Sequence, residues 1–186
     1  MSSILITKRS GTPQKYQIPK QKKYLDQLCS IRPRLTRCNT SEVGKQVTLG
    51  ANMSTVDLAE HVAEVCASLT VRHWEYGQLG GRVVVSMLHR QTPKTFVECV
   101  LQLRDTLSTE FVDTCLRNKD VFNNMIVSER DFQYDIMGIR TLQRSYLLKV
   151  QNVIVERPQY MLMRVAVALH GDNIDMVRKP YEATSL

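Results

Sequence analysis

The chain has 186 residues, of which 43% are hydrophobic and 23% charged, with eight glycines and six prolines. This composition excludes collagen-like and disordered chains, and it supplies enough apolar mass for one or two folded domains. No apolar run approaches the roughly 20 residues that a membrane-spanning helix needs, so no membrane partner is expected. The start, MSSILITKRSG, is not typical of a signal peptide.

The formal net charge of +7 comes from the start of the chain. Residues 1–40 hold nine Lys or Arg against one acid, Asp26, a charge of +8, whereas the other 146 residues hold 16 basic and 17 acidic side chains. A basic segment of this kind suits a polyanion such as nucleotide phosphates, nucleic acid or an acidic partner. A solubilising basic tail is the alternative.

The first ninety residues predict a hairpin and helices. Residues 3–18 form the hairpin, with its turn at Ser10-Gly11-Thr12-Pro13, and a helix follows from near Pro19 to about Ser30. Ser54 and Asp57 match a capping box that opens a helix over 55–70. The next helix, over 73–89, buries one face: Tyr76, Leu79, Val83 and Met87.

Three glycines in that second long helix, Gly77, Gly80 and Gly81, indicate close approach of a neighbouring helix. The sharper alternative is that GQLGGR is a phosphate loop. No GKS or GKT follows it and no strand precedes it, which argues against a phosphate loop.

The second half predicts further helices and one hairpin. Thr92-Pro93 is expected to cap a helix with Phe96, Val100, Leu103 and Leu107 on its apolar face, before short helices at 108–117 and 119–127. Gly138 is expected to break residues 130–145, and Gln151-Asn152 to turn a hairpin over 146–156. Another helix runs from Pro158 to about His170, before the cap Gly171, and its predicted apolar face is Met161, Leu162, Val165 and Leu169.

The five cysteines are odd in number and form no CxxC motif. Without a secretory signal they favour a reducing, cytoplasmic location, with Cys66, Cys99 and Cys115 as core thiols. The histidines lack metal-ligand spacing, so no metal site is expected, and no nucleophilic triad is visible. The charge clusters Glu129-Arg130-Asp131 and Glu156-Arg157 are predicted to be local ion pairs.

A family resemblance lies in residues 129–170, ERDFQYDIMGIRTLQRSYLLKVQNVIVERPQYMLMRVAVALH. This stretch resembles the start of the N-terminal domain of the class I ribonucleotide reductase large subunit, whose pattern is ERDF–Y–G–TL–RSYLL–ERPQ–M–RV–IH. ITKRSG at 6–11 resembles the VIKRDG opening of the family's ATP-cone. STVDL at 54–58 and HWEYGQLGGRVVVSMLHR at 73–90 are similar to the cone's third and closing helices.

The resemblance implies a mainly α fold, with a small N-terminal β-hairpin on a helix bundle and then a helical domain with one short β-hairpin. The ATP-cone-like allosteric domain would span residues 1–91, and the N-terminal helical domain residues 92–186, truncated before the catalytic barrel. The family's catalytic cysteines lie on that barrel. This segment of an oxidoreductase is therefore expected to hold no catalytic residue and to be inactive alone, as an N-terminal fragment or a prematurely terminated version.

The implied function is regulation of ribonucleoside-diphosphate reduction, which supplies deoxyribonucleotides for DNA replication. The effector is ATP or dATP. The implied partners of a full-length chain are the large-subunit homo-oligomer and the radical-generating small subunit.

The implied nucleotide-binding residues match the family one by one. Lys8 and Arg9 correspond to the basic pair at the phosphates, Lys20 to the lysine that starts the first helix, and Thr55 to the threonine at the head of the third helix. Lys8 and Arg9 also precede a tight turn, where basic side chains converge on a compact anion.

Four positions depart from the family pattern. Gln14 stands where an acidic nucleotide contact is usual, Arg90 replaces a lysine, Ser10 replaces the aspartate of KRDG, and Ala59 replaces an aspartate tied to inhibition by dATP. These departures predict weaker nucleotide binding, or binding that does not distinguish ATP from dATP.

Two alternatives stay open. One is a catalytically inert, truncated paralogue that acts as a subunit-interaction module. The other is a nucleic-acid binder that uses the basic first forty residues, although the chain has no RRM, KH or helix-turn-helix signature.

Overall fold

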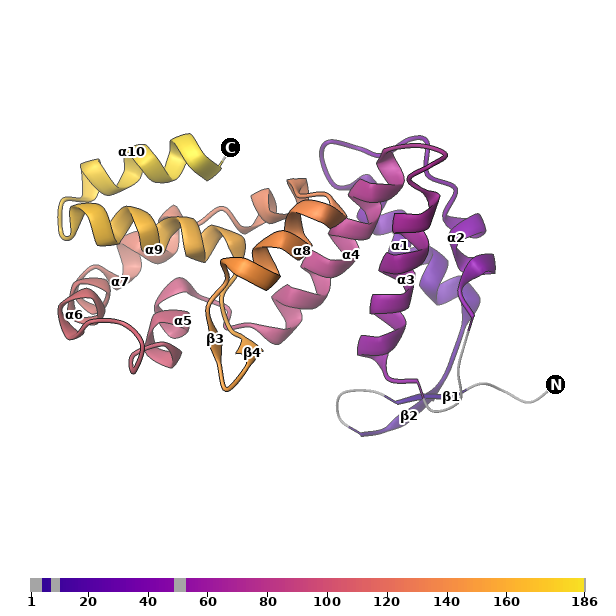
Figure 1. The fold of residues 1–186 in the computed structure, drawn as a ribbon, viewed down its shortest axis with the longest axis horizontal. Coiled ribbons are helices and arrows are strands. Elements are labelled where there is room, and N and C mark those ends of the chain that lie inside the picture. The colour runs from indigo at the N-terminus through magenta and orange to yellow at the C-terminus, as the bar shows by residue number, and fades with distance from the viewer. Residues whose placement is uncertain (1–4, 8–10, 49–52, 186) are drawn as a thin grey trace. The chain divides into compact units, whose positions relative to one another are not determined.

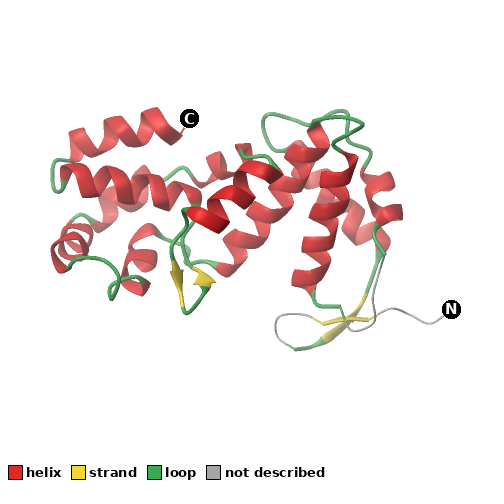
Figure 2. Cartoon of the chain, viewed as in Figure 1, coloured by secondary structure: helices red, strands yellow, loops and turns green. Residues whose placement is uncertain are grey.

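The computed structural model describes residues 5–7, 11–48 and 53–185. These residues are mainly helical with two short antiparallel strand pairs, which confirms the predicted fold class (Figures 1 and 2). The chain packs as two compact units, Met1–Met87 with Phe132–Ile139, and Leu88–Asp131 with Arg140–Leu186. The functional domains expected at 1–91 and 92–186 stay a prediction. Among the described helices, none combines the length and apolarity needed to span a membrane.

The first unit begins with the predicted hairpin. Strand β1 (Leu5–Thr7) pairs antiparallel with β2 (Pro13–Lys15), and Ile6 lies opposite Gln14. Residues 8–10 of the expected turn lie outside the described residues. Helix α1 (Ile18–Ser30) follows, confirming the predicted helix, and its proline lies in the first turn, where the missing N–H costs no intrahelical bond. It buries Leu25 and Leu28.

Two capped helices come next. Helix α2 (Thr40–Gln46) was not predicted from the sequence, and the Asn39 side chain caps it by accepting from the backbone N–H groups of Ser41 and Glu42. Helix α3 (Thr55–Leu69) begins with the predicted capping box, because Ser54 and Asp57 bond each other's backbone N–H groups. It buries five side chains, Val62, Ala63, Val65, Cys66 and Leu69.

Helix α4 (Glu75–Gln91) contains the whole GQLGGR segment, so the phosphate-loop alternative is wrong. The predicted apolar face is buried: Tyr76, Leu79, Val83 and Met87. The predicted close approach of a helix is confirmed at Gly80, whereas Gly81 is approached by non-helical backbone just before residue 136. A Cβ atom on Gly80 would lie 3.0 Å from Ile136 Cδ1, and one on Gly81 would lie 2.3 Å from the carbonyl oxygen of Tyr134.

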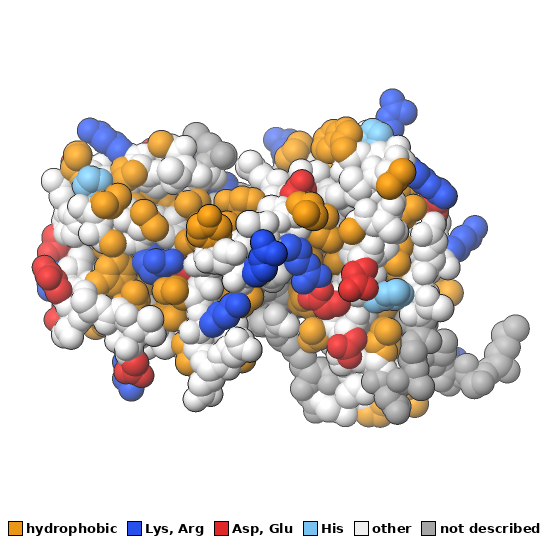
Figure 3. Space-filling view, in the orientation of Figure 1, with side chains coloured by type: hydrophobic (Ala, Val, Ile, Leu, Met, Phe, Trp, Pro, Cys, Tyr) orange, Lys and Arg blue, Asp and Glu red, His pale blue; other side chains and the backbone are white. Residues whose placement is uncertain are grey.

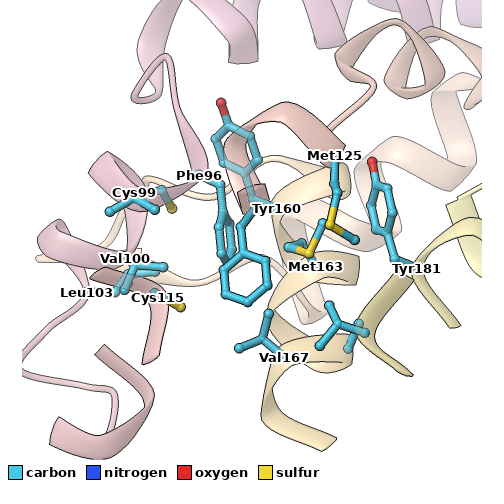
Figure 4. Packing of buried hydrophobic residues seen from close by; sticks show 14 of the residues in the cluster. Phe96, Cys99, Val100, Leu103, Cys115, Met125, Tyr160, Met163, Val167 and Tyr181 are labelled. Carbon is cyan, nitrogen blue, oxygen red and sulfur yellow. The ribbon is translucent and has the colours of Figure 1, made fainter. Parts of the chain in front are cut away.

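The second unit is built from short helices around an aromatic and sulfur-rich core. Its elements, some shared with the first unit, are α5 (Phe96–Gln102), α6 (Thr109–Arg117), α7 (Lys119–Met125), the 3-10 helix Ser128–Gln133, α8 (Ile136–Ser145), β3 (Lys149–Val150), β4 (Val153–Ile154), α9 (Pro158–His170) and α10 (Ile174–Ser185). Figure 4 shows Phe96 and Tyr160 side by side in this core, and Phe96 makes edge contacts with the rings of Tyr160 and Phe122.

Two predicted helix boundaries are wrong. The N-cap of α5 is Thr95, not Thr92, because Thr95 and Glu98 form a complete capping box. Thr92 is buried instead, and its hydroxyl donates to the carbonyl of Leu88 at 2.8 Å. Gly138 does not break the chain. It lies in the first turn of α8, where its N–H donates to Asp135 Oδ1 at 2.7 Å and so satisfies one of the helix's free donors.

The β3–β4 hairpin is confirmed, with Gln151 (φ 48°) and Asn152 (φ 66°) in the left-handed conformation that a tight two-residue turn requires. Helix α9 and its cap Gly171 are confirmed too, but the predicted face of α9 is wrong. Val165 and Leu169 are exposed, whereas Tyr160, Met163, Ala166 and Val167 are buried. The helix has apolar residues on both faces, so spacing alone does not choose between them. Packing chooses the face that shares a core with Val177 and Tyr181 of α10.

Candidate functional site

The hairpin of the first unit meets the start of α3. The backbone N–H of Thr7 donates to the carbonyl of Met53 at 3.0 Å, and Thr7 forms a parallel bridge with Ser54. Thr55, the exposed first residue of α3, follows directly. Gln14 lies on the partner strand, next to the position opposite Thr7. The structure therefore brings the hairpin that contains Gln14 to the end of α3 that contains Thr55.

The start of α3 has the electrostatics of an anion site. The capping box occupies the backbone N–H groups of Ser54 and Asp57. The helical ladder gives no intrahelical acceptor to the first N–H groups, those of Thr55 and Val56. The aligned peptide dipoles add positive potential at this end. Hydrogen bonds from Ser54 lower the pKa of the Asp57 carboxyl, which keeps it charged as a cap.

Of the other predicted nucleotide-binding residues, the structure describes Lys20 near the hairpin and Arg90 in the other compact unit. Lys20 is exposed in the first turn of α1, which follows β2 directly, and Tyr16 and Gln21 are hydrogen-bonded to each other around that junction. Lys8 and Arg9 lie outside the described residues. Arg90 is exposed in the last turn of α4 and belongs to the second compact unit.

The charge clusters are not local ion pairs, and that prediction is wrong. Asp131 is fully buried, with Oδ2 2.6 Å from Nε2 of His89 and Oδ1 accepting from the backbone N–H of Gln159 at 3.0 Å. Arg157 donates from Nε to the Thr92 hydroxyl at 2.8 Å, and it also bonds the carbonyl of His89 at 3.1 Å.

Glu156 likewise finds its partners elsewhere. It is buried and accepts from Nε of Arg164 at 2.7 Å and from the backbone N–H of Leu148 at 3.0 Å. Glu156 and Arg157 are neighbours on extended backbone, so their side chains point to different sides and each finds a partner elsewhere. No local pattern in the sequence marks these pairings.

Arg82, the arginine of GQLGGR, is another residue whose role the sequence did not reveal. Its side chain is fully buried and donates to backbone carbonyls of Leu28 at 2.8 Å, Ile31 at 3.0 Å, Pro33 at 2.5 Å and Phe132 at 3.3 Å. It joins the end of α1 and the residues that follow it to the 3-10 helix Ser128–Gln133, which is a structural role rather than phosphate binding.

The cysteines of the chain are all free thiols, and the predicted burial of Cys66, Cys99 and Cys115 is confirmed. Across the part of the chain that the structure describes, no three His, Cys, Asp or Glu side chains are grouped so that they could hold a metal ion.

Comparison with known proteins places the chain among reductase sequences. Residues 132–186 match a family model described as "Ribonucleotide reductase, all-alpha domain". The chain is 35% identical over 98% of its length to the ribonucleoside-diphosphate reductase large chain 2 of Saccharomyces cerevisiae, covering 22% of that protein. It is 34% identical over 99% of its length to the large subunit of Dictyostelium discoideum, covering 23% of it. The large subunit of Arabidopsis thaliana is 38% identical over 80% of the chain, which covers 20% of that subunit.

The chain thus spans about a fifth to a quarter of the length of the curated relatives it matches. These matches confirm the resemblance to the large subunit that the ERDF, RSYLL and ERPQ segments indicated. The chain is therefore related over nearly its whole length to ribonucleotide reductase large subunits, and its residues 132–186 match the all-alpha domain of that family.

Proposed function

We propose that this chain is a regulatory segment of a ribonucleoside-diphosphate reductase large subunit, which binds ATP or dATP where the β1–β2 hairpin meets α3. The observation that supports this most directly is the bridge between Thr7 and Ser54. It sets the hairpin against the positive end of a 15-residue helix, next to a segment of the sequence rich in Lys and Arg. The segments ITKRSG and STVDL, which resemble the family's ATP-cone, and the local electrostatics favour the same end of the first unit.

Each proposed contact has a chemical basis. Lys8, Arg9 and Lys20 supply positive charge for the phosphates, and the backbone N–H groups of Thr55 and Val56 supply directed donors. Gln14 offers one carboxamide oxygen where a carboxylate would offer two. Ala59, one turn after Thr55 on the same helix, offers no polar atom. Binding with little discrimination between ATP and dATP follows from these two side chains.

The activity of the whole protein is part of the proposal. In a full-length large subunit the segment would regulate reduction of ribonucleoside diphosphates carried out elsewhere in the protein, within a large-subunit oligomer that also engages the radical-generating small subunit. Five free thiols suit a reducing compartment, and we place this activity in the cytoplasm. No residue of the segment is proposed as catalytic.

Titration calorimetry of the chain with Mg-ATP and Mg-dATP tests the nucleotide site. We expect saturable binding of both nucleotides with similar affinity. The double variant Lys8→Ala/Arg9→Ala should lose more than tenfold in affinity, since each lost charge-assisted contact contributes roughly 1.5–3 kcal/mol. Lys20→Ala should weaken binding as well. Lys23→Ala, an exposed lysine on the same helix as Lys20, is the matched control and should bind normally.

The contrary outcomes are distinct. An unchanged affinity in the double variant would remove Lys8 and Arg9 from the site. Absence of any saturable nucleotide binding would reject the effector role, and retained binding to a full-length large subunit would then support the interaction module.

On the face that Figure 3 shows, basic side chains are interspersed with acidic and apolar ones. Steeply salt-dependent DNA binding would instead favour the nucleic-acid alternative.

A further inference from the structure

Two cysteines of the first unit face each other. Cys29 lies in the last turn of α1 and Cys38 just before α2, and a hydrogen bond between the two thiols is the largest influence on the pKa of each. Both side chains are half-buried, so small solutes reach them, in contrast to the buried thiols of Cys66, Cys99 and Cys115. A contact between two partly exposed thiols is the arrangement from which a disulfide forms.

Contacts on both sides hold the two cysteines together. The hydroxyl of Thr40 donates to Oδ1 of Asp26 at 2.6 Å, and the backbone N–H of Leu35 donates to the carbonyl of Cys29 at 2.9 Å. Hydrogen bonds at Asp26 and at Cys29 therefore tie the end of α1 to residues 35–40, the segment that contains Cys38.

The backbone around Cys38 is fixed to the start of α4. The N–H of Arg37 donates to a carboxylate oxygen of Glu75 at 2.6 Å, and the N–H of Asn39 donates to the hydroxyl of Tyr76 at 3.0 Å. These bonds lie one residue on either side of Cys38. The meeting of the two thiols is thus determined by the fold.

The surroundings make the two thiols unequal. The Cys38 thiol donates its hydrogen bond to the sulfur of Cys29, which lowers the pKa of Cys29, and the buried guanidinium of Arg82 lowers it further. Partial burial of Cys29 opposes this lowering, and the carboxylates of Asp26 and Glu75 oppose it more weakly. As the donor, Cys38 has a raised pKa. Cys29 is the more nucleophilic member of the pair, because thiolates rather than thiols attack.

We propose that Cys29 and Cys38 are an oxidation-sensitive dithiol that a hydroperoxide converts into an intramolecular disulfide. The Cys29 thiolate attacks one oxygen of hydrogen peroxide, the O–O bond breaks, and the products are a sulfenic acid on Cys29 and hydroxide. Cys38 gives its proton to hydroxide and attacks the oxidised sulfur. The S–S bond forms, the S–O bond breaks, and the departing hydroxide takes up a proton. In total two thiols and one peroxide yield one disulfide and two waters.

The other three cysteines serve as an internal control for the oxidation of Cys29 and Cys38. Burial raises the pKa of the Cys66, Cys99 and Cys115 thiols to about 12, so they remain protonated near neutral pH. Oxidation of the folded chain should therefore be confined to the pair. This site does not depend on nucleotide binding, and it can be tested whether or not the chain binds ATP.

Peptide mapping of the whole chain tests the dithiol. The reduced protein is treated with one equivalent of hydrogen peroxide, its remaining thiols are alkylated after unfolding, and its peptides are analysed by mass spectrometry. We expect a cross-linked peptide joining Cys29 to Cys38, with the other three thiols alkylated. This readout needs no variant, so it does not depend on whether a substitution folds.

Two serine variants test the order of attack. In Cys38→Ser, dimedone should trap a sulfenic acid on Cys29, because no second thiol is in contact with it. In Cys29→Ser, Cys38 should react at least tenfold more slowly with peroxide. A predominant cross-link to Cys66, or oxidation of Cys29 no faster than that of Cys99 and Cys115, would overturn the proposal.

Discussion

The Nε2 atom of His89 lies 2.6 Å from Oδ2 of Asp131, 42 residues further along the chain. His89 stands near the end of α4 and Asp131 in the 3-10 helix, and the carboxyl of Asp131 is completely buried. Its second oxygen accepts from the backbone N–H of Gln159, in the first turn of α9. One carboxyl group therefore joins three segments of the second unit.

Replacing His89 with alanine should destabilise the protein in a pH-dependent way. Burial raises the pKa of Asp131, and the bond to His89 opposes that rise. Without His89 the folded-state pKa rises further above its unfolded value, so folding favours the protonated acid, and stability falls as pH increases through the folded pKa. Urea unfolding should show a loss of about 3 kcal/mol or more at pH 7, and a smaller loss at pH 5.

His61→Ala is the control for this experiment, since His61 is partly exposed and its ion pair with Glu64 lies at the surface. It should change stability little at either pH. An equal loss at pH 5 and pH 7 for His89→Ala would show that the charge of Asp131 does not control the effect.

Gly81→Ala should be strongly destabilising. The added Cβ would lie 2.3 Å from the carbonyl oxygen of Tyr134 and 2.6 Å from the carbonyl carbon of Asp135, and backbone atoms cannot rotate away. We expect a loss of about 2 kcal/mol or more in the free energy of unfolding. In the matched variant, Gly44→Ala in α2, the Cβ meets open space, and helix propensity should stabilise it by up to about 1 kcal/mol. Similar destabilisation of both variants would refute the packing argument.

Arg82→Met should cost about 3 kcal/mol or more in unfolding free energy, because four backbone carbonyls, three of them in or after the last turn of α1 and one on Phe132, lose their hydrogen bonds to the guanidinium. Arg82→Lys should recover only part of the loss, since an ammonium group cannot span the positions that the planar guanidinium reaches. Arg72→Met, which removes an exposed ion pair with Glu42, should cost less than about 1 kcal/mol. Equal stability of the Met and Lys variants at position 82 would contradict the requirement for a branched donor.

Thr40→Val should make the protein less sensitive to acid. The hydrogen bond from Thr40 is the largest cause of the lowered pKa of Asp26, followed by that from Lys22. A carboxyl whose folded pKa is lowered stabilises the fold above its unfolded pKa of about 3.9 and loses that contribution as pH falls through the folded pKa. NMR titration should therefore show a higher pKa for Asp26 in Thr40→Val, and a shallower loss of stability in acid. An unchanged titration midpoint would show that Thr40 does not hold the carboxylate.

Local signals in the sequence were sufficient where the determining interaction spans a few residues. The Ser54 and Asp57 capping box, the Gln151-Asn152 turn and the Gly171 cap each act within about one helical turn, and each was predicted. Where two local signals competed, the prediction failed. Thr92-Pro93 and Thr95 both suit a helix start, and only Thr95 has Glu98 three residues later to complete a capping box.

The candidate nucleotide site was only partly accessible to the same reasoning. Charge and family resemblance singled out Lys8, Arg9, Lys20 and Thr55, but the contact between the hairpin and α3 required Thr7 and Ser54 to meet across the fold. The glycines of α4 illustrate the same division. Their spacing predicted a close neighbour, and the structure identified that neighbour as the backbone of Tyr134 and Asp135.

The sequence by itself determined the mainly helical class, the start of α3, the end of α9, both hairpins and the relationship to reductase large subunits, because these depend on short-range periodicity, capping and motif order. Only the tertiary structure decided which face of α9 is buried, which partner each buried charge takes, and that Cys29 meets Cys38. A buried polar group loses its hydrogen bonds to water and needs a partner within the protein. That partner comes from whichever distant segment packs against the group, so the residues adjacent in sequence do not identify it.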